Sequence, residues 1–167
     1  MRAQSAGSRA AGAKQWWGLA AWVFLCLLVS ALGGLVTASS VNDWYTTLHK
    51  PPFNPPDWVF APVWTALYLM MAVAAWRVWR LPGSDLRSRG LWMFGAQLAV
   101  NLAWSFLFFG WQRIDLALLG ILLLLALIAF NLRLFLQLDR TAGWLLLPYL
   151  AWVTFATLLN ASLWRLN

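Results

Sequence analysis

The sequence has very few charged residues and almost none of the residue types on which most active sites depend. Charged side chains make up 10% of the 167 residues; five residues are acidic, one is a histidine and one a cysteine. A soluble domain usually carries about 25% charged residues, so this chain cannot cover a water-facing surface. The single cysteine, Cys26, excludes a disulfide within the chain and leaves the redox compartment undetermined.

Five long runs without any charged residue occupy most of the chain, at residues 15–42, 58–76, 90–112, 116–132 and 141–164. Each run can supply the ~17–25 residues that a helix needs to cross the hydrocarbon core, and no period-2 alternation suggests a barrel. The sequence therefore predicts an all-α membrane protein, a bundle of five transmembrane helices at about 15–39, 57–80, 87–109, 115–137 and 141–164. Residues 1–14 are predicted to form a disordered basic tail before this single domain at 15–167.

The scarcity of polar chemistry also limits what the bundle can catalyse. No cluster of His, Cys, Asp and Glu has metal-ligand spacing, and we expect neither a metal nor a bound cofactor. No Ser–His–acid or paired-carboxylate arrangement is present, and no carboxylate, lysine or histidine lies in the interior of a span. Conventional acid–base catalysis is not expected, whereas photochemistry or radical chemistry through tryptophan stays open.

The positively charged residues lie mainly in the N-terminal tail and in or near the short loops between the predicted helices. The net charge is +7, and one side of the five-span arrangement holds Arg2, Arg9, Lys14, Arg77, Arg80, Arg87, Arg89, Arg133 and Arg140, against Lys50, Arg113 and Arg165 on the other. This asymmetry is the one that membrane topology requires, so we expect no nucleic-acid partner. The positive-inside rule places the N-terminus in the cytoplasm if the host is a bacterial inner membrane.

The segment between the first two predicted helices, Asn42 to Pro56, is expected to form an ordered lid over one end of the bundle. It carries Pro51, Pro52, Pro55 and Pro56, which exclude a regular helix, together with the aromatic residues Trp44, Tyr45 and Phe53. This Pro/Trp-rich first loop is too aromatic for a plain solvated linker.

Fourteen tryptophans are the most unusual feature of the composition. Ten lie near predicted helix ends, as in an aromatic belt: Trp16, Trp17, Trp44, Trp58, Trp76, Trp79, Trp92, Trp111, Trp144 and Trp164. Trp64, Trp104 and Trp152 lie deeper, where lipid tails offer no partner to an indole N–H. We expect these three to face inward, either for core packing or for ligand binding.

Polar residues at depth allow the same two interpretations. They are Thr65, Tyr68, Gln97, Asn101, Tyr149, Thr154 and Asn160. Hydrogen bonding between helices is the commoner use of such residues. The alternative is an aromatic pocket with a few polar groups, suited to a flat hydrophobic ligand; Asn101 and Trp104, three residues apart, share a helix face.

The third predicted helix carries small residues at four-residue spacing, Gly95, Ala99 and Ala103. Such rows let two helices approach closely. We therefore predict a homodimer through this face, although the row also suits packing within one chain.

Several blocks of the sequence resemble the TspO/translocator protein family (tryptophan-rich sensory proteins, also called the peripheral-type benzodiazepine receptor family). The first loop and the start of the next helix contain Trp44-Tyr45, Leu48-His49-Lys50-Pro51, Asn54-Pro55-Pro56 and Trp58-Val59-Phe60. The helices contain Val63-Trp64-Thr65-Ala66-Leu67-Tyr68, the run from Gln97 to Trp104, Phe108-Phe109-Gly110, Pro148-Tyr149-Leu150-Ala151-Trp152, Phe155-Ala156-Thr157 and Leu159-Asn160.

This resemblance implies a five-helix bundle, often dimeric, that binds porphyrins such as protoporphyrin IX and, in some members, cholesterol or synthetic isoquinoline carboxamides. The family's pocket lies under the first loop and would here use Tyr45, Trp64, Asn101, Trp104, Trp152 and Ala156. Trp64 and Trp152 match tryptophans linked to light-dependent porphyrin breakdown in some bacterial members.

Two positions depart from the family pattern. Phe53 stands where family members often have Trp. This difference keeps an aromatic ring at the position but removes the indole N–H. The cholesterol motif needs a Tyr before the terminal Arg, but Ala161 and Ser162 occupy that stretch before Arg165, so the motif is incomplete and we predict no specific cholesterol binding through it.

The expected function is therefore porphyrin binding in an intramembrane pocket, for sensing, sequestration or transport. The alternatives are light- or oxygen-dependent porphyrin degradation involving Trp64 and Trp152, and a regulatory scaffold that reports ligand occupancy to a partner.

Overall fold

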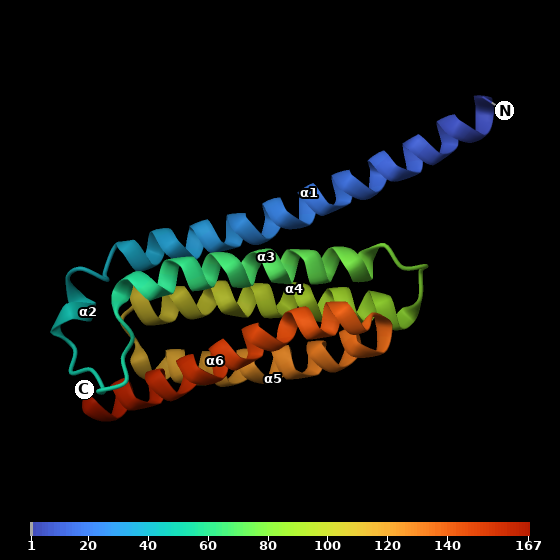
Figure 1. The fold of residues 1–167 in the computed structure, drawn as a ribbon. Coiled ribbons are helices and arrows are strands. Elements are labelled where there is room, and N and C mark those ends of the chain that lie inside the picture. Colours follow the sequence, from blue (N-terminus) through green and yellow to red (C-terminus); the bar gives the residue numbers. More distant parts are fainter. Residues whose placement is uncertain (1) are drawn as a thin grey trace.

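The computed structural model describes the backbone of residues 2–167 and the side chains of residues 15–167, and this part of the chain is helical with short connections (Figure 1). The elements are α1 (Arg2–Ala38), α2 (Trp44–Thr47), η1 (Asp57–Val59), α3 (Phe60–Trp79), α4 (Asp85–Ser105), η2 (Phe106–Gly110), α5 (Ile114–Leu138) and α6 (Arg140–Leu166). The predicted disordered tail at residues 1–14 falls outside the residues whose side chains are described, and it stays a prediction.

Five helical segments are long and apolar enough to cross a membrane. They are Gln15–Ala38, Asp57–Trp79, Asp85–Gly110, Ile114–Leu138 and Arg140–Leu166. The predicted all-α fold with five spans is confirmed. The limits of the five spans lie within a few residues of the predicted helices, whereas α1 as a whole begins at Arg2. The chain is an integral, multi-pass membrane protein.

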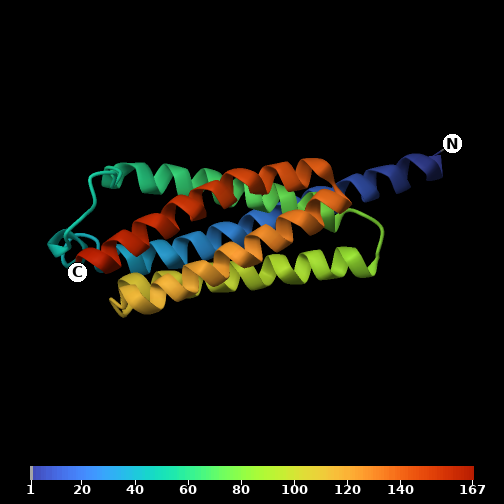
Figure 2. The same ribbon diagram turned by 90° about the horizontal axis from the view of Figure 1, so that it is seen from below.

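The helices form a bundle in which α1 packs mainly on α3, while α5 lies between α4 and α6 (Figures 1 and 2). Helix α6 also packs on α3, which brings the first and last parts of the bundle together. The short connections make α4, α5 and α6 successive neighbours, because a short loop can join only adjacent ends. The first loop closes the end of the bundle at which α6 finishes (Figure 1).

The third span does not end as a regular α-helix. We expected helix to residue 109, but α4 stops at Ser105 and a π-helical turn, η2, continues to Gly110. The N–H of Trp111 donates to the carbonyl of Phe106 at 2.7 Å, a step of five residues. Such turns are frequent at functional sites, and this one sets Phe108 and Phe109 against the first loop.

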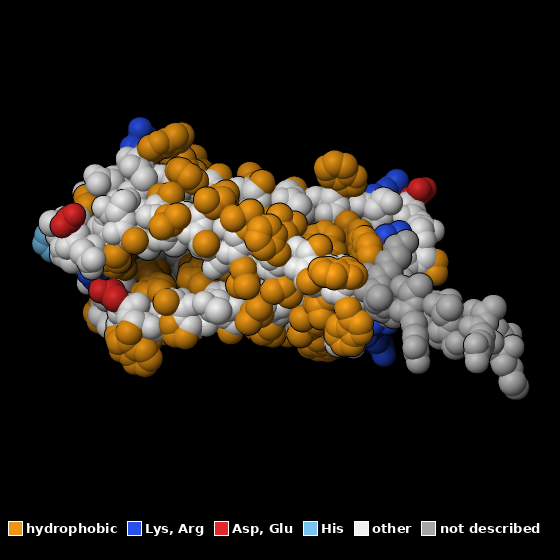
Figure 3. Space-filling view, turned by 90° about the horizontal axis from the view of Figure 1, so that it is seen from above, with side chains coloured by type: hydrophobic (Ala, Val, Ile, Leu, Met, Phe, Trp, Pro, Cys, Tyr) orange, Lys and Arg blue, Asp and Glu red, His pale blue; other side chains and the backbone are white. Residues whose placement is uncertain are grey.

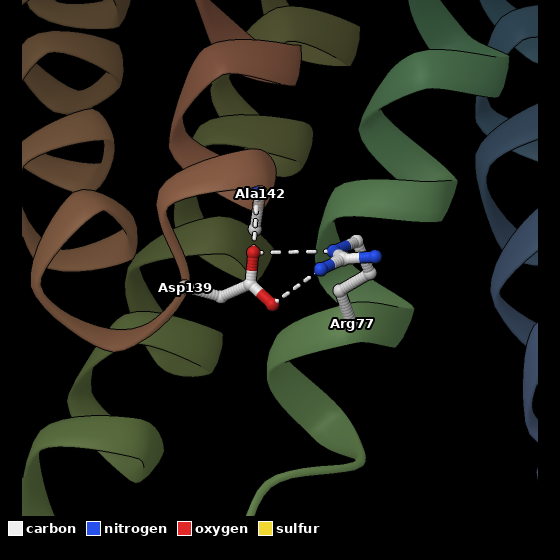
Figure 4. A network of polar contacts seen from close by, with 3 residues as sticks. All are labelled: Arg77, Asp139 and Ala142. Carbon is white, nitrogen blue, oxygen red and sulfur yellow. Dashed lines mark hydrogen bonds and ion pairs between the residues drawn. The ribbon is translucent and has the colours of Figure 1, made fainter.

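Two side-chain networks join helices that are distant in sequence. Asp139 lies between α5 and α6, where its carboxylate accepts from Ala142 N–H at 2.8 Å and pairs with Arg77 of α3 (Figure 4). Within the membrane, Gln97 of α4 donates to Asn131 of α5 at 3.2 Å. Asn131 in turn donates to the carbonyl of Gly90 at 2.8 Å, so both amides serve packing between helices.

Most of the tryptophans assigned to the aromatic belt do lie on the surface. Seven of the ten are exposed: Trp16, Trp17, Trp58, Trp92, Trp111, Trp144 and Trp164. The three deep tryptophans are partly buried and pack against the core clusters. Trp44, Trp76 and Trp79, which were also assigned to the belt, are half-buried like the three deep tryptophans.

Candidate functional site: an aromatic cavity under the first loop

A cavity of about 440 Å³ lies inside the bundle at the end closed by the first loop. Its lining comes from α1, the first loop, α3, α4, η2 and α6: Ser30, Gly33, Gly34, Thr37, Ala38, Val41, Asn42, Tyr45, Asp57, Phe60, Ala61, Trp64, Thr65, Tyr68, Asn101, Trp104, Ser105, Phe108, Phe109, Trp152, Ala156, Leu159, Asn160 and Leu163. Asp57 is the one residue of this lining that carries a charge. A cavity of this kind suits a hydrophobic ligand.

The six residues expected to form a pocket all line this one cavity. Tyr45 comes from α2 in the first loop, Trp64 from α3, Asn101 and Trp104 from α4, and Trp152 and Ala156 from α6. The structure thus brings together residues separated by more than a hundred positions.

The first loop is held over the cavity by hydrogen bonds around Tyr45. The buried Tyr45 hydroxyl donates to Asn54 Oδ1 at 2.9 Å, and Lys50 Nζ lies 4.3 Å from the centre of the Tyr45 ring. Burial, with a smaller contribution from the negative charge of Asp57, raises the pKa of Tyr45 to about 12. The hydroxyl therefore stays protonated at neutral pH and acts as a donor that ties the loop together.

Two polar residues in the wall are paired with other helices. Asn101 donates through its amide nitrogen to the Tyr149 hydroxyl at 2.7 Å, which joins α4 to α6. The Trp104 indole N–H donates to Asn160 Oδ1 at 3.1 Å, and Asn160 donates in turn to the carbonyl of Ile114 at 3.0 Å. Because Trp104 already has a protein partner, its contribution to the cavity is its ring face.

Trp152 differs from Trp104 in this respect. Its indole nitrogen is fully buried and makes no hydrogen bond to the described part of the chain. Its ring packs edge-on against Phe60 at 5.9 Å and tilts against Phe155 at 5.6 Å. A buried donor without a partner carries a free-energy cost, and such groups in native structures call for an explanation. An acceptor for this N–H has to come from outside the described protein, as an ordered water or a bound molecule.

Trp64 contributes mainly an aromatic surface. Its ring lies 5.8 Å from that of Tyr68, which also lines the cavity, and 6.3 Å from that of Tyr149, which is fully buried and outside the lining. Flat rings arranged in this way offer stacked and edge contacts to a planar ligand.

Sequence reasoning missed several lining residues as site residues, notably Phe60, Phe108, Phe109 and Gly33. Gly33 permits a close approach of α1 to α4, because an added Cβ would lie 3.2 Å from Ser105 Oγ. Phe108 stacks on Trp104 at 5.3 Å. The four-residue spacing between Trp104 and Phe108 indicates that the two share a helix face, so Phe108 could have been predicted as a site residue. The π-helical turn that orients Phe108 could not be predicted from the sequence.

The small-residue row on α4 lies away from the cavity. Gly95, Ala99 and Ala103 are all exposed, and a Cβ added to Gly95 would meet no atom within 4 Å. The row therefore lies on the outer surface of the described part of the chain.

Comparison with known proteins places these features in a family. A model of the TspO/MBR family matches residues 22–165. The chain is 40% identical over 158 residues to the tryptophan-rich protein TspO of Chlorobaculum tepidum, covering 89% of this chain and 95% of that protein. It is 40% identical over 149 residues to the tryptophan-rich sensory protein of Cereibacter sphaeroides (87% and 92%) and 39% identical over 146 residues to the human translocator protein (84% and 86%).

Proposed function

Because this chain belongs to the TspO/MBR family of membrane proteins, we propose that it binds a porphyrin, or a flat tetrapyrrole of similar chemistry, in the cavity under the first loop. The observation that carries the proposal is the lining itself, in which Trp64, Trp104 and Trp152 surround one space inside the membrane. The volume of about 440 Å³ lies within the ~300–1,000 Å³ of ligand pockets.

The polar groups of the wall give such a ligand an orientation. The unpartnered N–H of Trp152 favours a ligand acceptor, such as a carboxylate or a carbonyl. Asn101 uses its amide nitrogen on Tyr149, so its amide oxygen is the atom left for a ligand donor. Lys50 in the first loop supplies a positive charge outside the lining, to which the ligand's anionic groups would turn.

The test is a titration of the purified protein in detergent with protoporphyrin IX, followed by tryptophan fluorescence quenching. We expect saturable quenching with a midpoint of about 1 μM or tighter, weakened roughly tenfold in Trp152→Phe. Trp144→Phe, which removes an exposed ring outside the lining, is the matched control and should bind like the wild type. Linear quenching, identical in all three proteins, would mean partitioning into the micelle and would refute the proposal.

Light-dependent degradation of the bound porphyrin is a second candidate. The observation in its favour is the contact of Trp64 with Tyr68 and Tyr149, because adjacent Trp and Tyr rings can pass an electron hole between them. Illumination of the complex in air should then yield a product, and Trp64→Phe combined with Trp152→Phe should abolish it. Intact porphyrin after illumination of the wild type would leave binding as the function.

Three further expectations belong to the same proposal. The chain forms a homodimer through Gly95, Ala99 and Ala103, and the end of α6 holds no specific sterol site. If the host membrane is a bacterial inner membrane, the N-terminus lies in the cytoplasm. The expected absence of a sterol site would be contradicted by saturable sterol binding that is lost in Arg165→Ala.

A further inference from the structure

The cavity is open on one side only among the described residues. Six residues of its lining are exposed: Gly34 and Ala38 on α1, Asn42 and Asp57 in and just after the first loop, and Ala61 and Thr65 on α3. The lining residues on α4, η2 and α6 are all buried or half-buried. The open side therefore lies between α1 and α3, where the surface is hollowed near the first-loop end (Figure 3).

This opening faces hydrocarbon rather than water for most of its length. Gly34 and Ala38 belong to the span Gln15–Ala38, and Ala61 and Thr65 belong to the span Asp57–Trp79. At ~1.5 Å per residue, Thr65 lies about 12 Å along the helix from Asp57. The opening thus runs from the membrane interface into one leaflet.

Within the two spans, and after Asp57 at the start of the second, the rim of the opening is built from small residues that carry no charge. A Cβ added to Gly34 would meet no atom within 4 Å, so nothing fills the gap beside it. The Thr65 hydroxyl donates to the carbonyl of Ala61 in its own helix at 2.9 Å, so it presents no unpaired donor to lipid. A flat ring can pass such a rim edge-on without leaving a polar group unsatisfied.

The same two helices are fastened to each other at the opposite end. The Trp76 indole N–H donates to the carbonyl of Gln15 at 2.9 Å, and the rings of Trp16 and Trp76 stack at 6.3 Å. Gly18 lies so close to the Trp79 ring that an added Cβ would overlap it. Helices α1 and α3 are therefore joined at one end and open at the other.

The alternative route, through the first loop, is closed by hydrogen bonds. The Ser40 hydroxyl donates to the carbonyl of Phe109 at 2.6 Å, and Tyr45 is bonded to Asn54. The backbone N–H of His49 donates to Asn167 Oδ1 at 2.9 Å, and Asn167 Nδ2 donates back to the carbonyl of His49 at 3.2 Å. Passage from water would have to break these bonds, whereas passage from the side breaks none.

We propose that the ligand reaches the cavity sideways from the bilayer, through a portal between Gly34 and Ala38 of α1 and Ala61 and Thr65 of α3. The proposal rests on the proposed function, since it concerns the route to that same cavity. It also restricts the ligand to molecules that partition into a membrane. The first loop then stays closed while the ligand enters. The charged groups of the ligand enter the cavity last and remain at the end of the bundle next to the first loop.

The test measures the rate of binding to protein reconstituted in lipid vesicles. Protoporphyrin IX is added and the quenching of tryptophan fluorescence is followed by stopped flow in Gly34→Phe and Ala61→Phe, which narrow the portal. Ala31→Phe and Ala66→Phe are the matched controls, because both positions are exposed on the same helices outside the lining. Asn167→Ala releases the first loop from α6 and tests the other route.

We expect both portal variants to slow association by about tenfold and to slow dissociation as well, whereas a variant that only weakened binding would speed dissociation. The two controls and Asn167→Ala should keep wild-type rates, and the wild-type rate should follow the porphyrin-to-lipid ratio. Wild-type rates in both portal variants, or faster association in Asn167→Ala, would overturn the portal while leaving the binding site intact. Absence of saturable binding in the wild type would instead refute the proposed function itself.

Discussion

Arg77 holds both carboxylate oxygens of Asp139, with Nε at 3.1 Å from one oxygen and a terminal guanidinium nitrogen at 2.9 Å from the other (Figure 4). The same carboxylate accepts from the N–H of Ala142 and so caps the first turn of α6. One side chain therefore fastens the end of α3 to the junction of α5 and α6, opposite the end that holds the cavity.

Removing this carboxylate should destabilise the bundle in two separable steps. Asp139→Asn keeps a side chain that caps helices well but loses the ion pair, which is partly exposed and contributes up to about 1 kcal/mol. Asp139→Ala loses the cap as well, for a total of about 1–2 kcal/mol. Thermal unfolding in detergent should rank the proteins wild type, Asn variant, Ala variant. Equal melting temperatures for all three would contradict this role.

The same pair predicts a dependence of stability on acid. Burial alone would raise the pKa of Asp139, but its hydrogen bonds to Arg77 and to Ala142 N–H outweigh burial and hold the pKa below its usual value. A lowered folded-state pKa stabilises the fold above the unfolded-state value of about 3.9, and this contribution disappears as the pH falls through the folded-state pKa.

The melting temperature should therefore fall more for the wild type than for Asp139→Asn when the pH is lowered from about 6 to about 3. Other carboxylates titrate equally in both proteins, so the difference between the two curves isolates this group. Parallel curves would show that Asp139 does not titrate differently in the folded and unfolded states.

Trp104 and Trp152 should respond in opposite ways to the same substitution. Trp104→Phe removes the donor that Asn160 Oδ1 accepts, so it should destabilise the ligand-free protein by about 1–3 kcal/mol. Trp152→Phe removes a buried N–H without a partner and should leave the stability of the ligand-free protein unchanged or higher. Thermal unfolding without porphyrin measures both, and a large loss in Trp152→Phe would show that its N–H has a partner in the protein.

The exposed row on α4 predicts the oligomeric state. Ala99→Trp places a large ring where two copies of α4 would meet, so it should convert a dimer into a monomer in detergent. Ala126→Trp, at an exposed position of α5, is the matched control and should leave the dimer intact. Light scattering with detergent correction gives the mass of each, and a monomeric wild type would dismiss this face as an interface.

The membrane class and the five spans could be predicted because hydrocarbon requires each crossing segment to be long, apolar and internally hydrogen-bonded. The depth of Trp64, Trp104 and Trp152 followed from the same spans. The pattern could not supply the pairing of side chains between helices: Asp139 is bonded to Arg77, 62 residues away, and nothing in the sequence around either residue indicates this bond. Contacts across such a separation depend on how helices pack, which no local pattern records.

The sequence by itself determined that this is a membrane protein and which segments form its helices. It also determined which aromatic and amide side chains lie deep enough in the spans to form a pocket. Only the tertiary structure decided which of them keep a free polar atom, since Trp104 meets Asn160 while the indole N–H of Trp152 meets no partner in the described chain. It also decided that the cavity opens between α1 and α3. Both depend on the rotation and separation of neighbouring helices, which side-chain packing between distant segments sets.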